Sequence, residues 1–316
     1  MRAMRVVFFG SSDFSCPTLR AIASDPRFEV ALVVTQPDAR SGRGQNLSLN
    51  PVRNLADELG LKTHQPPKVG SPDSVAVLKG VEGDVLLTAA YGQKLSKEVL
   101  SLAKAPPLNL HASLLPRHRG ASPVHHAILC GDRRTGVSLM EMTQRMDAGP
   151  VFARKELAIE NHHTAGFLEQ KLALHARDLF LEKAADVCSG RLKGVPQEES
   201  EATLAPLLEK ELGRIRWSKT AEEIDRHVRA MTPWPGAFTF SPTDRSPTRL
   251  IIVSGEVLDL PSPAMPGTVV AFTSGIEVAT QAQVYRVLTV KRSGKKELPA
   301  AVFLRGFPIP VGTRLT

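Results

Sequence analysis

The sequence predicts an α/β domain built on a mostly parallel sheet, followed by a smaller domain that folds as a β-barrel. Short apolar runs alternate with helical patterns over roughly the first 190 residues, which is typical of a parallel sheet flanked by helices. Beyond residue 210 the apolar runs are short and are separated by Gly and Pro, as in small barrels. The 316 residues, 42% of them hydrophobic, are enough for two such cores.

In the first domain, apolar runs that end at glycines or polar turns predict strands, and the amphipathic stretches between them predict helices. The strands are expected over residues 6–9, 30–34, 85–87 and 108–110. The helices are expected over 15–24, 51–59, 71–78 and 122–130, and a long helix over 164–187 closes the domain. Ligands of such sheets bind beyond the carboxyl ends of the strands, so functional side chains are expected at that edge.

The second domain follows a stretch that is polar and rich in turn residues. Residues 190–209 include Gly194, Pro196 and several glutamates, a composition typical of a linker. We therefore expect a first domain over 1–189, a linker over 190–209 and a barrel over 210–316. In the barrel, a short helix is expected over 221–231 and strands over 250–253, 267–272, 275–279 and 285–291.

The charge of the chain is unevenly distributed. The net charge is +8 and the isoelectric point is near 9.6, which suggests a polyanionic partner such as nucleic acid or a phosphorylated substrate. Residues 210–316 hold 15 Lys and Arg against 9 Asp and Glu, so most of the surplus lies in the barrel. A predicted hairpin there clusters four basic residues that either contact phosphates or form an ordinary solvated turn: Lys291, Arg292, Lys295 and Lys296.

The cysteines and the start of the chain indicate a reducing compartment. Cys16, Cys130 and Cys188 are far apart, odd in number and without C-x-x-C spacing, so disulfides and a zinc site are disfavoured and a cytoplasmic protein is expected. The first apolar run meets a glycine and a polar turn, as a buried strand does and a signal peptide does not. No apolar window is long enough to span a membrane. His125 and His126 are adjacent on a predicted helix, which disfavours a shared metal.

An Asn, a His and a later Asp form the strongest candidate for chemistry. Asn109 and His111 are two residues apart at the end of a predicted strand, so their side chains lie on one face and can converge on one reacting atom. The amide can donate to a developing oxyanion, the imidazole can donate or move a proton, and Asp147 can orient the imidazole or hold a water. This combination indicates acyl or proton transfer. By spacing alone, the same residues could instead satisfy backbone groups at turns.

Two further segments follow predicted strands. Residues 36–50 hold Arg40 and Arg43 among glycines, so this long cationic loop either closes over an anionic substrate or is a surface insertion. Small residues at 88–90 before Tyr91 either let a flat ligand approach the backbone or act as packing spacers. The first strand is followed by one glycine instead of G-x-G-x-x-G, and no G-x-x-x-x-G-K-[ST] occurs, so NAD and ATP binding are disfavoured.

Four motifs together resemble the methionyl-tRNA formyltransferases, and the resemblance extends over nearly the whole chain. The motifs are Phe8-Phe9-Gly10-Ser11-Ser12-Asp13-Phe14, the run from Asn109 to Pro116 continuing to Gly120, Met146-Asp147-Ala148-Gly149-Pro150, and Gly213-Arg214-Ile215-Arg216-Trp217 with Pro233-Trp234-Pro235-Gly236-Ala237. The second and third are specific to folate-dependent formyl transfer, and the fourth is typical of tRNA-specific members. The resemblance implies a Rossmann-like formyltransferase domain followed by a barrel similar to an OB fold.

The resemblance also implies roles for individual residues. Asn109, His111 and Asp147 match the catalytic trio, and the implied co-substrate is 10-formyltetrahydrofolate, with no metal. Arg43, and Arg40 three residues before it, fall in a basic loop that by the resemblance would contact the acceptor end of a tRNA. Two departures, His118 where many relatives have Trp and the small residues 88–90 before the tyrosine, leave the trio untouched. The implied folate-binding residues are Ser113, Leu114, Leu115, Pro116 and Tyr91.

The implied reaction is attack of the free α-amine of initiator methionyl-tRNA on the formyl carbon. Asn109 and His111 would donate to the tetrahedral oxyanion, and Asp147 would orient His111 and a bridging water. The implied partners are this tRNA and the folate, and we expect a monomer. Related enzymes formylate glycinamide ribonucleotide or amino-sugar nucleotides, or hydrolyse formyltetrahydrofolate, and these remain alternatives. A nucleic-acid-binding module with an idle trio is disfavoured because so many polar groups converge.

Overall fold

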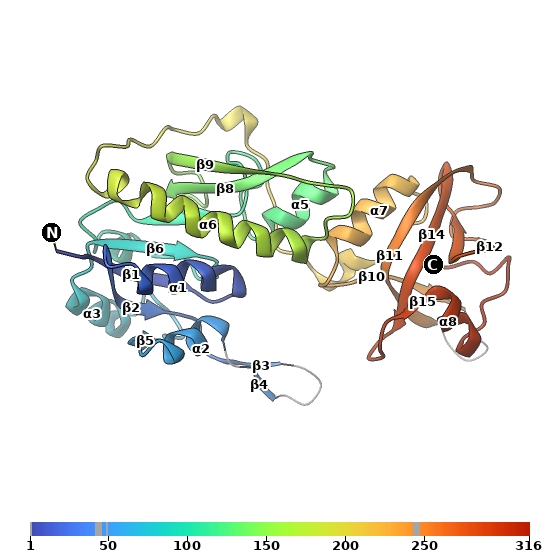
Figure 1. Cartoon of the computed structure of the whole chain (residues 1–316), viewed down its shortest axis with the longest axis horizontal. Coiled ribbons are helices and arrows are strands. Elements are labelled where there is room, and N and C mark those ends of the chain that lie inside the picture. The colour runs from blue at the N-terminus through green and yellow to red at the C-terminus, as the bar shows by residue number, and fades with distance from the viewer. Residues whose placement is uncertain (1, 42–45, 49, 243–246) are drawn as a thin grey trace. The chain divides into compact units, whose positions relative to one another are not determined.

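The chain divides into two units, each with its own sheet (Figure 1). The computed structural model describes residues 2–41, 46–48, 50–242 and 247–316. Unit 1 comprises Met1–Pro123, Arg134–Ala158 and Glu169–Pro206. Unit 2 comprises Val124–Arg133, Ile159–Leu168 and Leu207–Thr316.

Strands and helices alternate along the first half of unit 1. The strands are β1 (Met4–Gly10), β2 (Phe28–Val34), β3 (Ala39–Ser41), β4 (Asn46–Ser48), β5 (Thr63–His64), β6 (Val85–Ala89), β7 (Leu108–His111), β8 (Arg134–Glu141) and β9 (Val151–Ala158). The helices are α1 (Cys16–Ser24), α2 (Pro51–Glu58), α3 (Pro72–Val81), α4 (Lys97–Leu100) and most of α6 (Ala165–Cys188), with short 3₁₀ turns η1 (Asp13–Ser15) and η2 (Glu199–Glu201).

In the described part of unit 1, seven strands form one sheet in the order β5-β2-β1-β6-β7-β8-β9. The strands from β5 to β7 pair in parallel, whereas β8 and β9 pair antiparallel. The predicted fold class, with a mostly parallel sheet, is confirmed; β8 and β9 were not among the predicted strands. Because parallel strands point the same way, the carboxyl ends of β1, β6 and β7 lie at one edge of the sheet. β7 ends at His111 on that edge.

Buried apolar side chains hold helices against the sheet of unit 1. Val7 and Phe9 of β1 belong to one buried cluster with Val75 and Leu78 of α3. Residues 6 and 8 of the same strand point to the opposite face and are also fully buried, so both faces of the sheet are covered. This double burial explains why β1 is continuously apolar rather than alternating.

Side-chain caps start several helices where the loop sequence ends. Asn50 Oδ1 accepts hydrogen bonds from the backbone nitrogens of Val52 and Arg53 at the start of α2. Ser71 caps α3 in the same way. Each cap satisfies backbone donors that have no partner inside the helix, so these polar residues fix where the helices begin.

Unit 2 consists mainly of antiparallel strands. Its elements are nearly all of α5 (Pro123–Leu129), η3 (Lys210–Gly213), α7 (Ala221–Ala230), β10 (Ala237–Ser241), β11 (Thr248–Pro261), β12 (Val269–Phe272), β13 (Ile276–Ala279), β14 (Gln283–Arg292), β15 (Leu298–Pro299) and α8 (Ala300–Gly306). The described strands follow the order β10-β11-β14-β13-β12, with β15 paired to β14.

The C-terminal residues close this sheet into a barrel. Phe240 of β10 exchanges two backbone hydrogen bonds with Thr316, while Val269 of β12 donates to the Thr313 carbonyl. Leu315 also donates to the Gly267 carbonyl, so residues 313–316 lie between β10 and β12, the first and last strands of the sheet order. Closure removes unpaired strand edges, and it agrees with the barrel that the sequence predicted.

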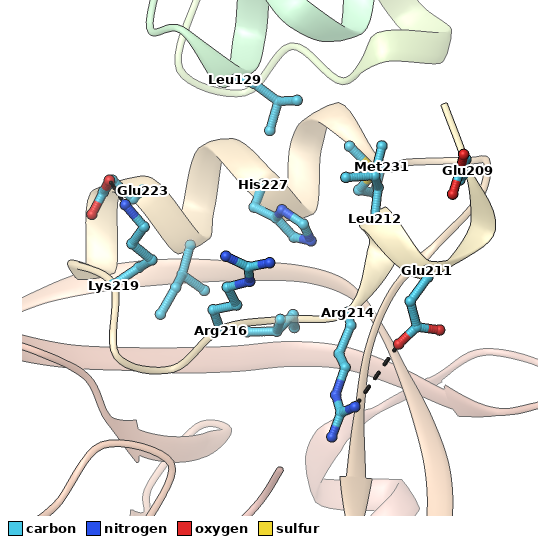
Figure 2. A pocket seen from close by; sticks show the side chains of 12 residues that line it. Leu129, Glu209, Glu211, Leu212, Arg214, Arg216, Lys219, Glu223, His227 and Met231 are labelled. Atoms are coloured by element: carbon cyan, nitrogen blue, oxygen red, sulfur yellow. Dashed lines mark hydrogen bonds and ion pairs between the residues drawn. The ribbon is translucent and has the colours of Figure 1, made fainter. Parts of the chain in front are cut away.

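A cavity of about 710 Å³ lies within unit 2, between α7 and the segment 209–219 (Figure 2). Its charged side chains largely neutralise one another: Lys219 pairs with Glu223 at 2.9 Å and Arg214 with Glu211 at 3.9 Å. His227 also lines it, and burial lowers the pKa of this imidazole. The cavity belongs wholly to unit 2 and contains no member of the candidate trio.

Candidate active site

β7 presents the first two members of the trio at the carboxyl edge of the sheet in unit 1. Asn109 pairs with Thr88 of β6 and with Met140 of β8, and His111 pairs with Ser138. Two residues along one strand share a face, so the strand holds both side chains toward the same space. The Asn109 side chain is half-buried and forms no hydrogen bond within the described residues, which leaves its amide available to a ligand.

The His111 ring is oriented by a backbone carbonyl. His111 is 6% exposed, and its Nε2 lies 2.9 Å from the carbonyl oxygen of His118. A carbonyl oxygen can only accept, so Nε2 carries the hydrogen and donates it. In the neutral ring, Nδ1 is then the unprotonated nitrogen, and it faces Asp147 with Oδ2 at 3.7 Å. Nδ1 is therefore the ring atom that can take up and release a proton.

Asp147 is held in a strained turn beside His111. Its φ of 48° lies in the left-handed region. This conformation costs a residue other than glycine free energy, and it persists only where surrounding contacts hold it. The Gly120 backbone nitrogen donates to Oδ2 at 2.9 Å. Gln197 donates to the Asp147 carbonyl oxygen at 2.8 Å. The structure thus brings His111 and Asp147 together and holds Asp147 both by its carboxylate and by its backbone carbonyl.

In the segment from Ser113 to Pro116, two side chains are buried and two are partly exposed. Ser113 is fully buried, and its hydroxyl donates to the Arg117 carbonyl at 2.7 Å. Leu115 lies in a buried cluster with Met140 and Val151. Leu114 and Pro116 are only half-buried, and they line a cavity of about 760 Å³ in unit 1. Of the four side chains, these two present surface to a ligand.

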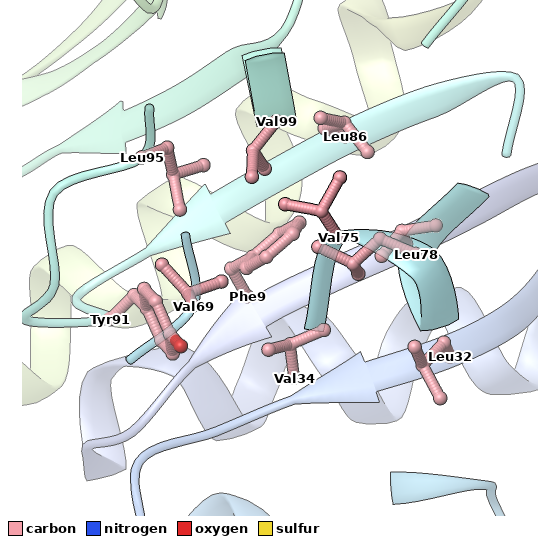
Figure 3. Close-up of a cluster of buried hydrophobic side chains, with 11 residues drawn as sticks. Phe9, Leu32, Val34, Val69, Val75, Leu78, Leu86, Tyr91, Leu95 and Val99 are labelled. Atoms are coloured by element: carbon pink, nitrogen blue, oxygen red, sulfur yellow. The ribbon is translucent and has the colours of Figure 1, made fainter. Parts of the chain in front are cut away.

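Tyr91 lies in the core rather than on the surface. The side chain is 1% exposed and meets the Phe9 ring edge to face at 5.5 Å (Figure 3). Burial raises the pKa of its hydroxyl to about 12. The backbone here is unusual, since Ala90 and Gly92 have φ of 46° and 83°. A ligand at this edge would therefore meet the backbone around Tyr91 rather than its ring.

Comparison with known proteins gives the family. Residues 4–183 match the family model described as formyl transferase, and residues 207–308 match the model of the formyl transferase C-terminal domain. The chain belongs to the formyl transferase family. Two relatives are the methionyl-tRNA formyltransferase of Methylococcus capsulatus, 39% identical over 99% of both chains, and that of Bacillus cereus, 36% identical over 99% of this chain and 98% of the relative.

This formyl transferase also shares its fold with more distant solved structures. HypX from Aquifex aeolicus, solved in complex with tetrahydrofolic acid, has a TM-score of 0.62 and 18% identity over 98% of this chain. The chain spans about half of HypX, 48% of its length. The likeness supports the two-part fold found here.

The described basic residues that the sequence assigned to tRNA binding lie on two hairpins of this formyl transferase. Lys291 and Arg292 end β14, which pairs with β15, and the turn between the strands carries Lys295 and Lys296. Lys291 is half-buried and the other three are exposed. Arg40 lies in β3, which pairs with β4, so part of the predicted loop 36–50 is a short hairpin. Arg43 lies outside the described residues.

Several residues near the trio have no signal in the sequence. Arg119 is 6% exposed and pairs with Glu199 at 3.0 Å, and Gln197 and Thr203 also bond to the loops that carry the trio. Gln197, Glu199 and Thr203 come from the polar stretch 190–206, which unit 1 includes up to Pro206. The partners of these side chains lie 48 to 85 residues away in the sequence, so no local pattern could reveal them.

In the described part of the chain, no three His, Cys, Asp or Glu side chains gather as a metal site requires. None of the helices among those residues is both long and apolar enough to cross a bilayer.

Proposed function

We propose that this formyl transferase transfers the formyl group of 10-formyltetrahydrofolate to the α-amine of methionyl-initiator tRNA, giving N-formylmethionyl-tRNA. The observation that carries the proposal is the His111–Asp147 pair, because the fixed Nε2–H leaves Nδ1 free to move a proton beside a carboxylate. The full-length identity of 39% to a methionyl-tRNA formyltransferase supports this acceptor over the alternatives.

The trio can supply the proton transfers that formyl transfer requires. The amine forms a new C–N bond and must lose a proton, while the folate nitrogen that leaves must gain one. His111 Nδ1 takes up the proton, directly or through a water, and the imidazolium is stabilised by the Asp147 carboxylate at 3.7 Å. It then returns the proton to the departing nitrogen. Asn109 donates its amide hydrogen to the formyl oxygen as negative charge develops there.

The tautomer of His111 determines when its Nδ1 can donate a hydrogen bond to the oxyanion. A neutral His111 already donates through Nε2 to His118, so Nδ1 has no hydrogen to offer an oxyanion. It becomes a donor only after it has accepted a proton. Asn109 is therefore the first donor to the oxyanion, and His111 joins it once the amine has been deprotonated.

The folate and the tRNA are assigned to different surfaces. Folate would bind at the carboxyl edge of the sheet in unit 1, where the half-buried Asn109 offers a neutral amide and the backbone around Tyr91 is accessible through small residues. The segment from Ser113 to Pro116 would contribute through Leu114 and Pro116. The tRNA would contact the exposed cations of the β14–β15 turn, together with Arg40 and Arg43. We propose that the protein acts as a cytoplasmic monomer.

The experiment is a comparison of acceptors. The purified chain is incubated with 10-formyltetrahydrofolate and, in separate reactions, with methionyl-initiator tRNA, glycinamide ribonucleotide or an amino-sugar nucleotide. The proposal expects formylation of the tRNA-bound methionine, faster than any other acceptor by on the order of 100-fold. Faster formylation of a nucleotide would show that the nucleotide, and not the tRNA, is the acceptor. Release of formate without any acceptor would indicate a hydrolase.

A further inference from the structure

Residues 197–205 run back across unit 1 and bind both loops that form the candidate site. The backbone nitrogen of Arg119 donates to the Thr203 carbonyl at 2.8 Å, and the Ala205 nitrogen donates to the Arg119 carbonyl at 2.7 Å. The His118 nitrogen donates to the Thr203 hydroxyl at 2.8 Å. His118 is the residue whose carbonyl orients His111, so this segment secures the loop that sets the imidazole.

Among the described residues, two side chains of this segment, Gln197 and Glu199, bond to both loops, and Gln197 is the one that bonds to the backbone of Asp147. Its Nε2 donates to the carbonyl oxygens of Asp147 at 2.8 Å and Gly149 at 2.7 Å. Its Oε1 accepts from Arg119 Nε at 3.0 Å. Both amide hydrogens and the amide oxygen are therefore used, and every partner lies in one of the loops that carry the trio.

The two donated bonds act where the chain is strained. Asp147 has a left-handed φ of 48°, and this conformation directs its carboxylate toward Gly120 and His111. Without an external anchor, a residue with a Cβ relaxes from this region toward right-handed or extended conformations of lower free energy. Gln197 holds the carbonyl groups of the two residues that flank Ala148, so it opposes that relaxation.

Arg119 holds the side chain of Gln197 in place by donating to its amide oxygen. Its guanidinium is nearly buried and bonds to both carboxylate oxygens of Glu199, at 3.0 and 3.2 Å. Arg119 also immediately precedes Gly120, whose nitrogen donates to Asp147. The carboxylate of Asp147 and its own backbone are thus held by two branches of one network, through Gly120 and through Gln197.

We propose that Gln197 is a positioning residue for formyl transfer, which holds Asp147 in the conformation that faces His111. The proposal rests on the proposed function. Gln197 touches no reacting atom; it acts through Asp147. Its loss therefore lowers the rate of the chemical step and leaves binding of both substrates nearly unchanged.

The test compares Gln197→Glu with the matched variant Gln65→Glu. Glu has the size of Gln and can still accept from Arg119, but a carboxylate has no hydrogen to donate to the two carbonyls. Gln65 makes the same kind of bridge elsewhere in unit 1, because its Nε2 donates to the Gln36 carbonyl and its Oε1 accepts from Arg53. We expect Gln197→Glu to lower kcat by on the order of 10- to 100-fold with KM for both substrates within about two-fold, and Gln65→Glu to leave kcat within about two-fold.

A second arm separates positioning from general support of the fold. In an Asp147→Asn background, Gln197→Glu should lower the remaining single-turnover rate by less than about two-fold, since the residue through which it acts is already impaired. Wild-type kcat in Gln197→Glu, or an equal loss in both backgrounds, would overturn the proposal. So would unfolding of both Gln197→Glu and Gln197→Ala in thermal melts. If the wild-type chain formylates no methionyl-tRNA, the proposed function fails first, and that outcome is seen before any variant is compared.

Discussion

His111 donates its Nε2 hydrogen to the carbonyl oxygen of His118 at 2.9 Å. This bond determines which ring nitrogen can exchange protons, and it comes from the backbone of a residue with a left-handed φ of 59°. The side chain at 118 differs from the Trp of many relatives, but the carbonyl that orients His111 is available from any residue that adopts this backbone. His118 in place of Trp therefore leaves the orientation of His111 intact.

The amide of Asn109 should be needed for the rate and not for binding. Asn109→Ala removes the donor to the formyl oxygen, and loss of one such donor lowers kcat by about 100- to 1,000-fold. Steady-state kinetics with both substrates varied would measure this, with folate binding by calorimetry as the control. A variant with normal kcat would show that Asn109 is not the oxyanion donor.

Gly120 should tolerate no side chain. A Cβ there would lie 2.5 Å from the Ala205 carbonyl oxygen, and its φ of 125° is strained for any other residue. Gly120→Ala should therefore destabilise the protein by about 2 kcal/mol or more and displace the nitrogen that donates to Asp147.

The matched control for Gly120 is Gly60→Ala. Gly60 has φ of 66° with nothing within 4 Å of a Cβ, so only the backbone term applies, about 1 kcal/mol. Urea denaturation and formylation rates of both variants test the contrast. If the two substitutions lowered the formylation rate equally, the close packing of Gly120 against the Ala205 carbonyl would not be what positions Asp147.

Glu199 should stabilise the protein at neutral pH and not in acid. The pKa of its carboxyl is lowered from 4.5 to about 2, first by the hydrogen bond from Arg119 and then by that from Arg145. A depressed pKa in the folded state means that the contribution is complete above the unfolded value and is lost as the pH falls from about 4.5 toward 2. Wild type should thus resist urea better than Glu199→Gln at pH 7, by a margin that shrinks in acid and at high salt. A margin independent of pH would show that the carboxylate charge is not its source.

The β14–β15 turn should contribute electrostatic affinity for tRNA. Replacing the exposed Lys295 and Lys296 by Gln should raise the Kd for initiator tRNA and reduce the slope of log K against log salt by about one for each lost phosphate contact. The kcat at saturating tRNA should not change. A double Gln replacement of Lys62 and Lys97, both exposed in unit 1, removes the same charge and serves as the control. Equal losses in the two variants would assign the effect to net charge alone.

Sequence reasoning located four strands of the parallel sheet because β1, β2 and β6 contain continuous apolar runs, while Leu108 and Leu110 of β7 alternate with polar residues before a turn. It also placed Asn109 and His111 on one face, since alternation along a strand is a local property. The sequence did not predict β9, because the charged residues Arg154, Lys155 and Glu156 interrupt its apolar run. It also could not find the network of Gln197 and Arg119, because polar residues in a turn-rich stretch look the same whether solvent or a distant backbone satisfies them.

Single-turnover formylation by wild type and by Asp147→Asn shows whether His111 and Asp147 carry formyl transfer to methionyl-tRNA. With enzyme in excess over methionyl-initiator tRNA and saturating 10-formyltetrahydrofolate, wild type should convert all the tRNA, whereas Asp147→Asn should be slower by about 100- to 10,000-fold and should bind both substrates normally. Conversion by Asp147→Asn at the wild-type rate would show that the Asp147 carboxylate takes no part in the transfer.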